Sequence, residues 1–220
     1  MEKPANRSYR LRGTRMTDGQ ELAYNKFWEK FSIPLNGEIE LKEYFPNSNA
    51  VIMEIGTGMG EATREMALAN PSIGILAVEV HRPGIGSLLA DIEELELSNV
   101  RVAEMDAISL LEDGLPENCV DGVRLYFPDP WPKVKHRKNR LINERFPALA
   151  RRALRPGGVV HLRTDHVEYF AQMLTVFRAD KTFTETETPA ELAAVTTDFE
   201  REFNAQGIPT NRASWLKTEA

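Results

Sequence analysis

From about residue 50 onward the chain alternates between two hydrophobic patterns. Short runs of consecutive apolar residues, typical of strands buried on both faces, are separated by stretches in which apolar residues recur every three or four positions, typical of helices. The predicted strands are Val51–Ile55, Ile73–Val80, Val100–Ala103, Gly122–Phe127 and Val159–Arg163. The predicted helices lie near residues 61–70, 85–97, 140–154 and 166–179. This order predicts an α/β fold with a mostly parallel central sheet and helices on both faces.

The two ends of the chain have patterns of their own. Residues 17–31 predict a helix that begins at Thr17 or Asp18, and a polar helix followed by a strand is predicted at Asp198–Ala205 and Ser214–Lys217. The apolar stripe of the first helix consists of Leu22, Tyr24, Phe27, Trp28 and Phe31. Residues 1–15 show no such pattern and predict a basic flexible arm. Because no linker or repeat divides the rest, we expect residues 16–220 to form a single domain.

Composition places the chain among soluble globular proteins. Hydrophobic residues make up 42% of its 220 positions and charged residues 27%, which excludes a disordered chain. No apolar run approaches the ~20 residues of a membrane helix, and no secretory signal is visible, so the expected location is cytoplasmic. Cys119 is the single cysteine, which excludes an internal disulfide and zinc sites built from cysteine clusters. The four histidines show no metal-binding spacing, and no metal is expected.

The charge of the chain is unevenly distributed. The net charge is −6, yet residues 1–15 carry +4 and residues 131–155 carry +8. The other 180 residues therefore carry −18. A chain polarised in this way repels polyanions over most of its surface and attracts them at one place, which predicts a phosphate-binding face.

A glycine-rich turn follows the first strand of the alternating region. Gly56, Gly58 and Gly60 form a G-x-G-x-G pattern that lets a ligand approach the backbone closely. The dinucleotide fingerprint needs its third glycine one position later, where Glu61 stands. Glu61 also puts negative charge at the helix start, where a pyrophosphate would lie. A ligand with a ribose, a cationic end and no phosphate fits better, and S-adenosylmethionine is such a ligand.

Three carboxylates at strand ends support this interpretation. Glu54 lies beside the glycines and can pair with the methionine ammonium group. Glu79 ends the second strand, where a carboxylate can accept hydrogen bonds from both ribose hydroxyls. Asp106 follows the third strand and can face the adenine amino group.

The segment after the fourth strand is the densest in candidate chemistry. Three prolines in five residues, from Pro128 to Pro132, predict a rigid loop. Ligands of open α/β sheets bind beyond the carboxyl ends of the strands, so Asp129 is expected where the reactive end of a ligand lies. Trp131 offers a stacking face, and Lys133 and the bases after it offer phosphate contacts.

Several motifs together resemble the tRNA (guanine-N7)-methyltransferase family of the TrmB type, over a region from about Met16 to the C-terminus. They are Glu54–Gly60, Val78–Gly84, Pro128–Lys133, Arg163–Asp165 and Thr197–Glu200. The resemblance implies a Rossmann-like class I fold of S-adenosylmethionine-dependent methyltransferases. It also implies methyl transfer to N7 of a guanosine in the tRNA variable loop (position 46), a tRNA modification.

The resemblance also implies residue roles. Glu54, Glu79 and Asp106 match the family's S-adenosylmethionine contacts, beside the glycine turn of Gly56, Gly58 and Gly60. Asp129 matches the catalytic aspartate, which also lies near the cofactor. The substrate-binding positions are matched by Lys133, Asp165, Thr197, Asp198, Phe199 and Glu200.

The chemistry of guanine indicates what such a site has to do. N7 carries a lone pair that Watson–Crick pairing leaves free, so it can attack the sulfonium methyl without first losing a proton. We expect Asp129 to accept a hydrogen bond from guanine N1–H or the amino group and to stabilise the positive charge that develops. N7 faces the deep, narrow groove of an RNA helix, so the target should be a loop base or one drawn out of its stack.

Two alternatives remain open from the residues alone. A nicotinamide-dependent oxidoreductase on a Rossmann-like fold often uses a Tyr-x-x-x-Lys pair, and none of the five tyrosines has a lysine four positions later. A non-catalytic RNA-binding module would not need the four carboxylates Glu54, Glu79, Asp106 and Asp129. The expected partner is tRNA, and the oligomeric state stays open between a monomer and a homodimer.

Overall fold

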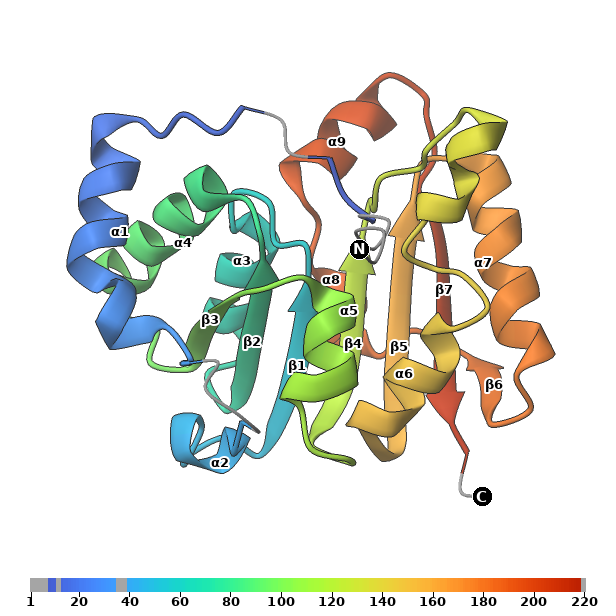
Figure 1. The fold of residues 1–220 in the computed structure, drawn as a ribbon, viewed down its shortest axis with the longest axis horizontal. Coiled ribbons are helices and arrows are strands. Elements are labelled where there is room, and N and C mark those ends of the chain that lie inside the picture. The colour runs from blue at the N-terminus through green and yellow to red at the C-terminus, as the bar shows by residue number, and fades with distance from the viewer. Residues whose placement is uncertain (1–7, 11–12, 35–38, 219–220) are drawn as a thin grey trace, which may run out of the picture.

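The computed structural model describes residues 8–10, 13–34 and 39–218. In these residues a seven-stranded sheet has the order β3-β2-β1-β4-β5-β7-β6 (Figure 1). The strands are β1 (Ala50–Ile55), β2 (Ile73–Glu79), β3 (Val100–Glu104), β4 (Val120–Tyr126), β5 (Leu154–Thr164), β6 (Phe183–Thr186) and β7 (Asn211–Lys217). β1 to β5 are parallel, and β7 runs antiparallel between β5 and β6. The predicted α/β class and mostly parallel sheet are confirmed.

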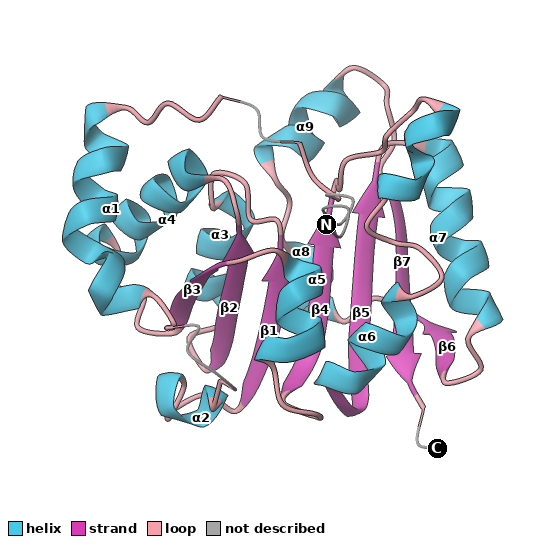
Figure 2. Cartoon of the chain, in the orientation of Figure 1, coloured by secondary structure: helices cyan, strands magenta, loops and turns pink. Residues whose placement is uncertain are grey.

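Helices cover both faces of the sheet, which explains why its inner strands are apolar along their whole length (Figure 2). The helices are α1 (Asp18–Phe31), α2 (Leu41–Tyr44), α3 (Glu61–Ala69), α4 (Arg82–Glu94), α5 (Ala107–Ser109), η1 (Leu110–Gly114), η2 (Val134–Asn139), α6 (Phe146–Ala153), α7 (Val167–Ala179), α8 (Ala190–Ala194) and α9 (Asp198–Ala205). One apolar cluster lies beneath α5, η1, α6 and α7, and a second beneath α1, α3, α4 and α8.

The predicted start of α1 is confirmed by its cap. The Thr17 side chain accepts from the N–H of Gln20, and the Gln20 side chain accepts from the N–H of Thr17, so two backbone donors at the helix start are satisfied. The predicted apolar stripe is wrong at Leu22, which is 67% exposed. Ala23, one position later, is buried in its place against the neighbouring α4.

The prediction of one helix over residues 140–154 is also wrong. The chain forms the short 3-10 helix η2 first, and α6 begins only at Phe146. Pro147 lies in the first turn of α6, where a proline is tolerated. Before it, the side chain of Arg140 is buried and 1% exposed. The backbone of residues 140–145 takes a non-helical course that places this side chain inside the protein. The short elements α2 and β6 were not predicted, because each has four residues and carries little periodicity.

Within residues 8–10, 13–34 and 39–218, no helix is long and apolar enough to cross a membrane. In the same residues, no group of three or more histidine, cysteine or acidic side chains lies in a position to hold a metal ion.

Candidate functional site

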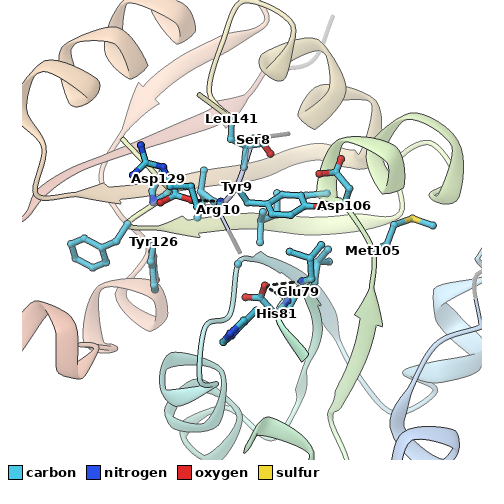
Figure 3. Close-up of a pocket in the computed structure, with 18 residues that line it drawn as sticks. Ser8, Tyr9, Arg10, Glu79, His81, Met105, Asp106, Tyr126, Asp129 and Leu141 are labelled. Atoms are coloured by element: carbon cyan, nitrogen blue, oxygen red, sulfur yellow. Dashed lines mark hydrogen bonds between the residues drawn. The ribbon is translucent and has the colours of Figure 1, made fainter. Parts of the chain in front are cut away.

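A cavity of about 310 Å³ opens at the carboxyl ends of the central strands. It lies beside β1 and β4, where the strand order reverses and where open α/β sheets bind their ligands. Gly56, Glu79, Asp106 and Asp129 line it, so the structure brings these four predicted residues together (Figure 3). The other lining residues include Ile55, Val78, Met105, Ala107, Leu125, Tyr126, Phe127 and Leu141.

The glycine turn reaches the cavity through Gly56. Gly56, Gly58 and Gly60 all have positive φ, at 75°, 58° and 92°, a conformation that side chains rarely adopt. The start of α4 packs against this turn so closely that a Cβ on Gly84 would lie 1.9 Å from the carbonyl oxygen of Gly58. The absence of a side chain at Gly84 therefore lets α4 pack directly against the turn.

The carboxylate of Glu79 is fixed by three main-chain donors. Its Oε1 accepts from the N–H of Val80 at 2.7 Å and of His81 at 2.9 Å (Figure 3). Its Oε2 accepts from the N–H of Gly58 at 2.9 Å. These hydrogen bonds set the carboxylate at the pocket wall in one orientation. Asp106 is fixed in a similar way, because its Oδ1 accepts from the N–H of Ile108 and of Ser109 at the start of α5.

Glu54 lies outside the pocket lining. It is 2% exposed, and its Oε2 accepts from Arg124 Nη2 at 2.5 Å and from the hydroxyl of Thr63. Arg124 itself is fully buried, so the two charges neutralise each other beneath the glycine turn. Its proposed pairing with a methionine ammonium group stays a prediction.

Asp129 lies on a loop with a constrained backbone. Pro128 and Pro130 flank it, and the nearby Phe127 and Trp131 have positive φ, at 49° and 41°. Such values in bulky residues persist only where the surroundings enforce them, and they gather at functional sites. The enforcing contact is Arg140, whose Nε donates to the carbonyl of Pro130 at 2.8 Å.

Residues 8–10 of the N-terminal segment lie across this loop. The N–H of Arg10 donates to Asp129 Oδ2 at 2.7 Å, and Trp131 Nε1 donates to the carbonyl of Ser8 at 3.1 Å. The guanidinium of Arg10 lies 4.5 Å from the centre of the Trp131 ring. Tyr9 points into the pocket between Asp129 and Asp106 (Figure 3). Residues 1–7 and 11–12 of the predicted arm lie outside the described residues, and the flexibility of the arm stays a prediction.

The predicted substrate-binding residues lie around the pocket rather than in its lining. Lys133 is exposed at the start of η2, and Asp165 follows the end of β5. Thr197 caps α9 by accepting from the N–H of Glu200 at 3.0 Å. The N–H of Asp198 donates to Glu61 Oε2 at 3.0 Å, which ties α9 to the start of α3.

Phe199 and Glu200 face in different directions from α9. Phe199 is 39% exposed and stacks on Phe203, with 4.2 Å between ring centres. It also meets Phe127 at a tilt of 56°, with 4.7 Å between ring centres. Glu200 is 0% exposed and is bonded to Arg163 and Arg212. In this structure Phe199 can meet a substrate directly, and Glu200 is enclosed by protein.

The comparisons with known proteins decide the family. A family model described as "Putative methyltransferase" matches residues 48–213. A tRNA (guanine-N(7)-)-methyltransferase of Nitrosospira multiformis is 45% identical over 79% of this chain and 76% of its own length. One of Neisseria meningitidis serogroup C is 39% identical over 95% and 88%. The chain belongs to the tRNA (guanine-N(7)-)-methyltransferase family.

Relatives of this family differ in length. The tRNA (guanine-N(7)-)-methyltransferase of Streptomyces avermitilis is 48% identical over 82% of this chain, and the chain spans 63% of that relative's length.

Solved structures show the same fold at low sequence identity. The 16S rRNA methyltransferase KamB has a TM-score of 0.58 at 15% identity and covers 82% of this chain and 93% of its own. TrmN from Thermus thermophilus has a TM-score of 0.56 at 20% identity, over 81% and 47%. The predicted Rossmann-like class I methyltransferase fold is confirmed.

The basic run of this methyltransferase does not form one continuous patch. Lys133, Lys135 and Lys138 are exposed on and before η2, beside the Asp129 loop. The later arginines bind protein groups, and Arg152 and Arg155 do so near the amino ends of β4 and β5, remote from the cavity. Arg145 pairs with Glu112, Arg155 pairs with Asp121, and Arg152 donates to the carbonyls of Leu111 and Leu115.

Sequence reasoning gave no role to three arginines that shape the site, although Arg163 belongs to one of the family motifs. Arg124 and Arg163 are fully buried, and Arg140 is nearly so. Arg124 lies in the middle of β4 and Arg163 near the end of β5. The signal that the sequence offers for both is an arginine within an otherwise apolar strand. Arg140 was hidden in the basic run, because nothing in the sequence separates an inward arginine from its exposed neighbours.

Proposed function

We propose that this methyltransferase transfers a methyl group from S-adenosylmethionine to N7 of a guanosine in the variable loop of tRNA. The observation that carries the proposal is the convergence of three carboxylates, Glu79, Asp106 and Asp129, on one cavity beside the glycine turn. Family membership and the identity of the relatives support the same reaction.

The pocket fits the proposed donor in size and chemistry. Its volume of about 310 Å³ falls within the range of about 300–1,000 Å³ common for small-ligand sites. Glu79 would bind the ribose hydroxyls, Asp106 would lie by the adenine amino group, and the positive-φ backbone of Gly56–Gly60 would allow close approach. Glu54 would lie behind the methionine end, with its charge shared with Arg124. When bound, the sulfonium group supplies an electrophilic methyl.

Asp129 would act on the guanine. Its carboxylate would accept from N1–H or the amino group, align N7 with the methyl carbon, and stabilise the positive charge that develops on the ring. The constrained loop keeps this carboxylate in place before the substrate arrives, so little reorganisation is needed during the reaction.

The surrounding residues would bring the base to Asp129. Exposed lysines on η2, with Lys133 nearest the loop, would contact phosphates on one side of the target. Asp165, Thr197, Asp198 and Phe199 would border the base on the other, and Phe199 offers a partly exposed aromatic side chain. A guanosine that leaves its stack would reach this site, and one held in a regular RNA helix would not.

A methylation assay tests this proposal directly. Purified protein is incubated with labelled S-adenosylmethionine and an unmodified tRNA transcript, and the product is mapped to the nucleotide and atom. We expect one N7-methylguanosine in the variable loop. A matched transcript with adenosine at that position should receive no label. No transfer to the first transcript, or equal transfer to both, would overturn the proposal.

A further inference from the structure

Arg163 is a buried cation next to the pocket, near the end of β5. In the sheet it lies beside Tyr126 of β4 and Arg212 of β7, and its side chain is 0% exposed. It does not line the cavity itself. A guanidinium enclosed by protein is tolerated only where its donors find acceptors, so its partners indicate what it holds together.

Three of those partners belong to the segment from α8 to α9. Arg163 Nη1 donates to the carbonyl of Val195 at 2.5 Å and to Glu200 Oε2 at 2.9 Å, and Nη2 donates to the carbonyl of Leu192. The fourth acceptor is Nε2 of His161, at 3.0 Å from Nε. One planar group therefore fixes both the chain that enters α9 and the first turn of α9.

The same residue contacts the strand that leads to Asp129. Its guanidinium carbon lies 4.3 Å from the centre of the Tyr126 ring, and its carbonyl accepts from the N–H of Phe127 at 2.8 Å. Phe127 in turn packs on Phe199 of α9, with 4.7 Å between the ring centres. Arg163 thus lies between the Asp129 loop and α9 and contacts both.

Glu200 completes the arrangement from the α9 side. Its Oε2 binds Arg163 and its Oε1 binds Arg212, whose side chain is 40% exposed. Glu200 is 0% exposed. Both of its oxygens bind arginines, and unlike Glu79 it does not line the cavity, which is the geometry of an anchor rather than of a substrate contact.

We propose that Arg163 and Glu200 are positioning residues that set α9, and with it the Phe199 ring, at a fixed place beside the Asp129 loop for the incoming RNA base. The inference rests on the proposed methyl transfer to tRNA. Neither residue lines the cavity proposed for the donor, so we expect their removal to change the use of tRNA and to leave donor binding intact.

Variants of Arg163 and of a matched arginine test the inference. Arg163→Met keeps an unbranched side chain that reaches about as far as Nε and removes every donor. Arg163→Lys keeps the charge but loses the planar guanidinium with its several donors. The control is Arg152→Met, because Arg152 also holds two backbone carbonyls, those of Leu111 and Leu115, but near the amino end of β4, away from the cavity. Four quantities are measured: KM for tRNA, kcat, the Kd of S-adenosylhomocysteine, and Tm.

We expect Arg163→Met to lower kcat/KM for tRNA by at least about tenfold, since a misplacement of about 1 Å can cost as much as 10²-fold. Arg163→Lys should recover part of this activity, and the Kd of S-adenosylhomocysteine should stay within about twofold in both. Arg152→Met should lower Tm without changing KM or kcat. If Arg163→Met alters Tm alone, the positioning role is wrong. If the unmodified enzyme transfers no methyl group, the proposed function fails instead.

If Arg163→Met does not fold, a variant at the surface can test the same proposal. Arg212→Gln removes the outer anchor of Glu200 at a half-exposed position, and it should raise KM for tRNA in the same direction. A direct phosphate contact by Arg212 would instead reduce the slope of log affinity against log salt by about 0.7–0.9. An unchanged slope with a raised KM supports positioning. A reduced slope, or an unchanged KM, overturns it.

Discussion

Asp129 shows how single residues in this protein depend on neighbours that are distant in sequence. Its loop is constrained by prolines on both sides and by Arg140, which donates to the carbonyl of Pro130. Arg140 is held in turn by Gln172 Oε1 at 2.7 Å and packs on the Tyr169 ring at 4.8 Å, both from α7. The orientation of the Asp129 carboxylate therefore depends on a series of contacts that extends through Arg140 to α7.

The first prediction concerns the charge of Asp129. Asp129→Asn keeps the shape of the side chain but replaces one acceptor oxygen with a donor and removes the negative charge. We expect the single-turnover rate of methyl transfer to fall by about 10²–10³, the usual cost of losing one preorganised electrostatic group, with Tm close to that of the unmodified protein. Asp113→Asn, at an exposed position in η1, is the control. A rate for Asp129→Asn equal to that of the control would contradict the assigned role.

The second prediction concerns pH and His161. Burial, and then the charge of Arg163, lower the pKa of His161 from its ordinary 6.5 to about 3. Between these values the unfolded chain binds a proton that the folded one does not. The stability contributed by neutral His161 is thus complete above pH 6.5 and declines as pH falls toward 3, with a slope of at most about 1.4 kcal/mol per pH unit.

Urea unfolding at several pH values measures this effect. The free energy of unfolding of His161→Gln should fall less steeply than that of the original protein as the solution is acidified from neutral pH. Gln can still accept from Arg163 and donate to the Ser214 hydroxyl, which His161 Nδ1 contacts at 2.8 Å. Parallel curves for the two proteins would show that His161 does not titrate as stated.

At the residue scale, the sequence identified the groups at strand ends better than the groups that hold them. Glu79 ends β2, and Asp106 and Asp129 follow β3 and β4 within a few residues. Parallel strands bring their carboxyl ends to the same side of a sheet. All three line the same cavity. Arg140 and Arg163 act through partners about 30 residues away, and no local pattern in a single sequence reports such contacts.

Among the elements, α4 and the glycine turn depend on each other most closely. The start of α4 approaches the turn so nearly that Gly84 has no room for a side chain. We predict that Gly84→Ala displaces the turn, because overpacking of this kind commonly costs about 1–3 kcal/mol. Donor affinity should fall with stability, as measured by calorimetric titration with S-adenosylhomocysteine and by urea unfolding.

Gly19→Ala is the matched control for this prediction. Gly19 lies in α1, and a Cβ there would meet no atom within 4 Å. Replacement by alanine inside a helix should raise stability by about 0.5–1 kcal/mol and leave donor affinity unchanged. Equal donor affinities for the two variants would show that the approach of α4 does not shape the turn.

Element boundaries were predicted well where periodicity is strong and badly where tertiary contacts override it. The helix Asp198–Ala205 has the predicted ends, and the five parallel strands lie at the predicted positions, with β5 longer than expected. The region 140–154 failed because its basic residues look helical, whereas Arg140 is drawn into a buried network. The four-residue strand β6 exists because β7 offers it an edge to pair with.

For the whole molecule, the decisive property is where the charge lies in space. A basic run that is continuous in sequence is divided into two groups in space. Its first part, on η2, stays exposed beside the pocket. Its later arginines, on and beside α6, bind carbonyls and carboxylates of the protein. Chain order alone could not separate these two parts.

The division leads to the last prediction. Lys135→Glu and Arg151→Glu each reverse the charge of one exposed residue. Only Lys135 lies on the pocket edge, so only Lys135→Glu should weaken tRNA binding and flatten the salt dependence, by about 0.7–0.9 in the log–log slope for each phosphate that the protein no longer neutralises. Filter binding at several salt concentrations provides the measurement. Equal decreases in affinity for both variants would contradict this prediction and would indicate that tRNA contacts both η2 and α6.

The direction of β7 has a practical consequence for handling the enzyme. Because β7 is antiparallel to β5, it starts at Asn211 beside the pocket edge and ends at Lys217 near the first residues of β5. A linker joined after this strand would leave from the side of the sheet remote from the cavity (Figure 1). Attachment to a bead or sensor chip through that end should leave the entrance open to RNA, whereas attachment near Ser8 would crowd it.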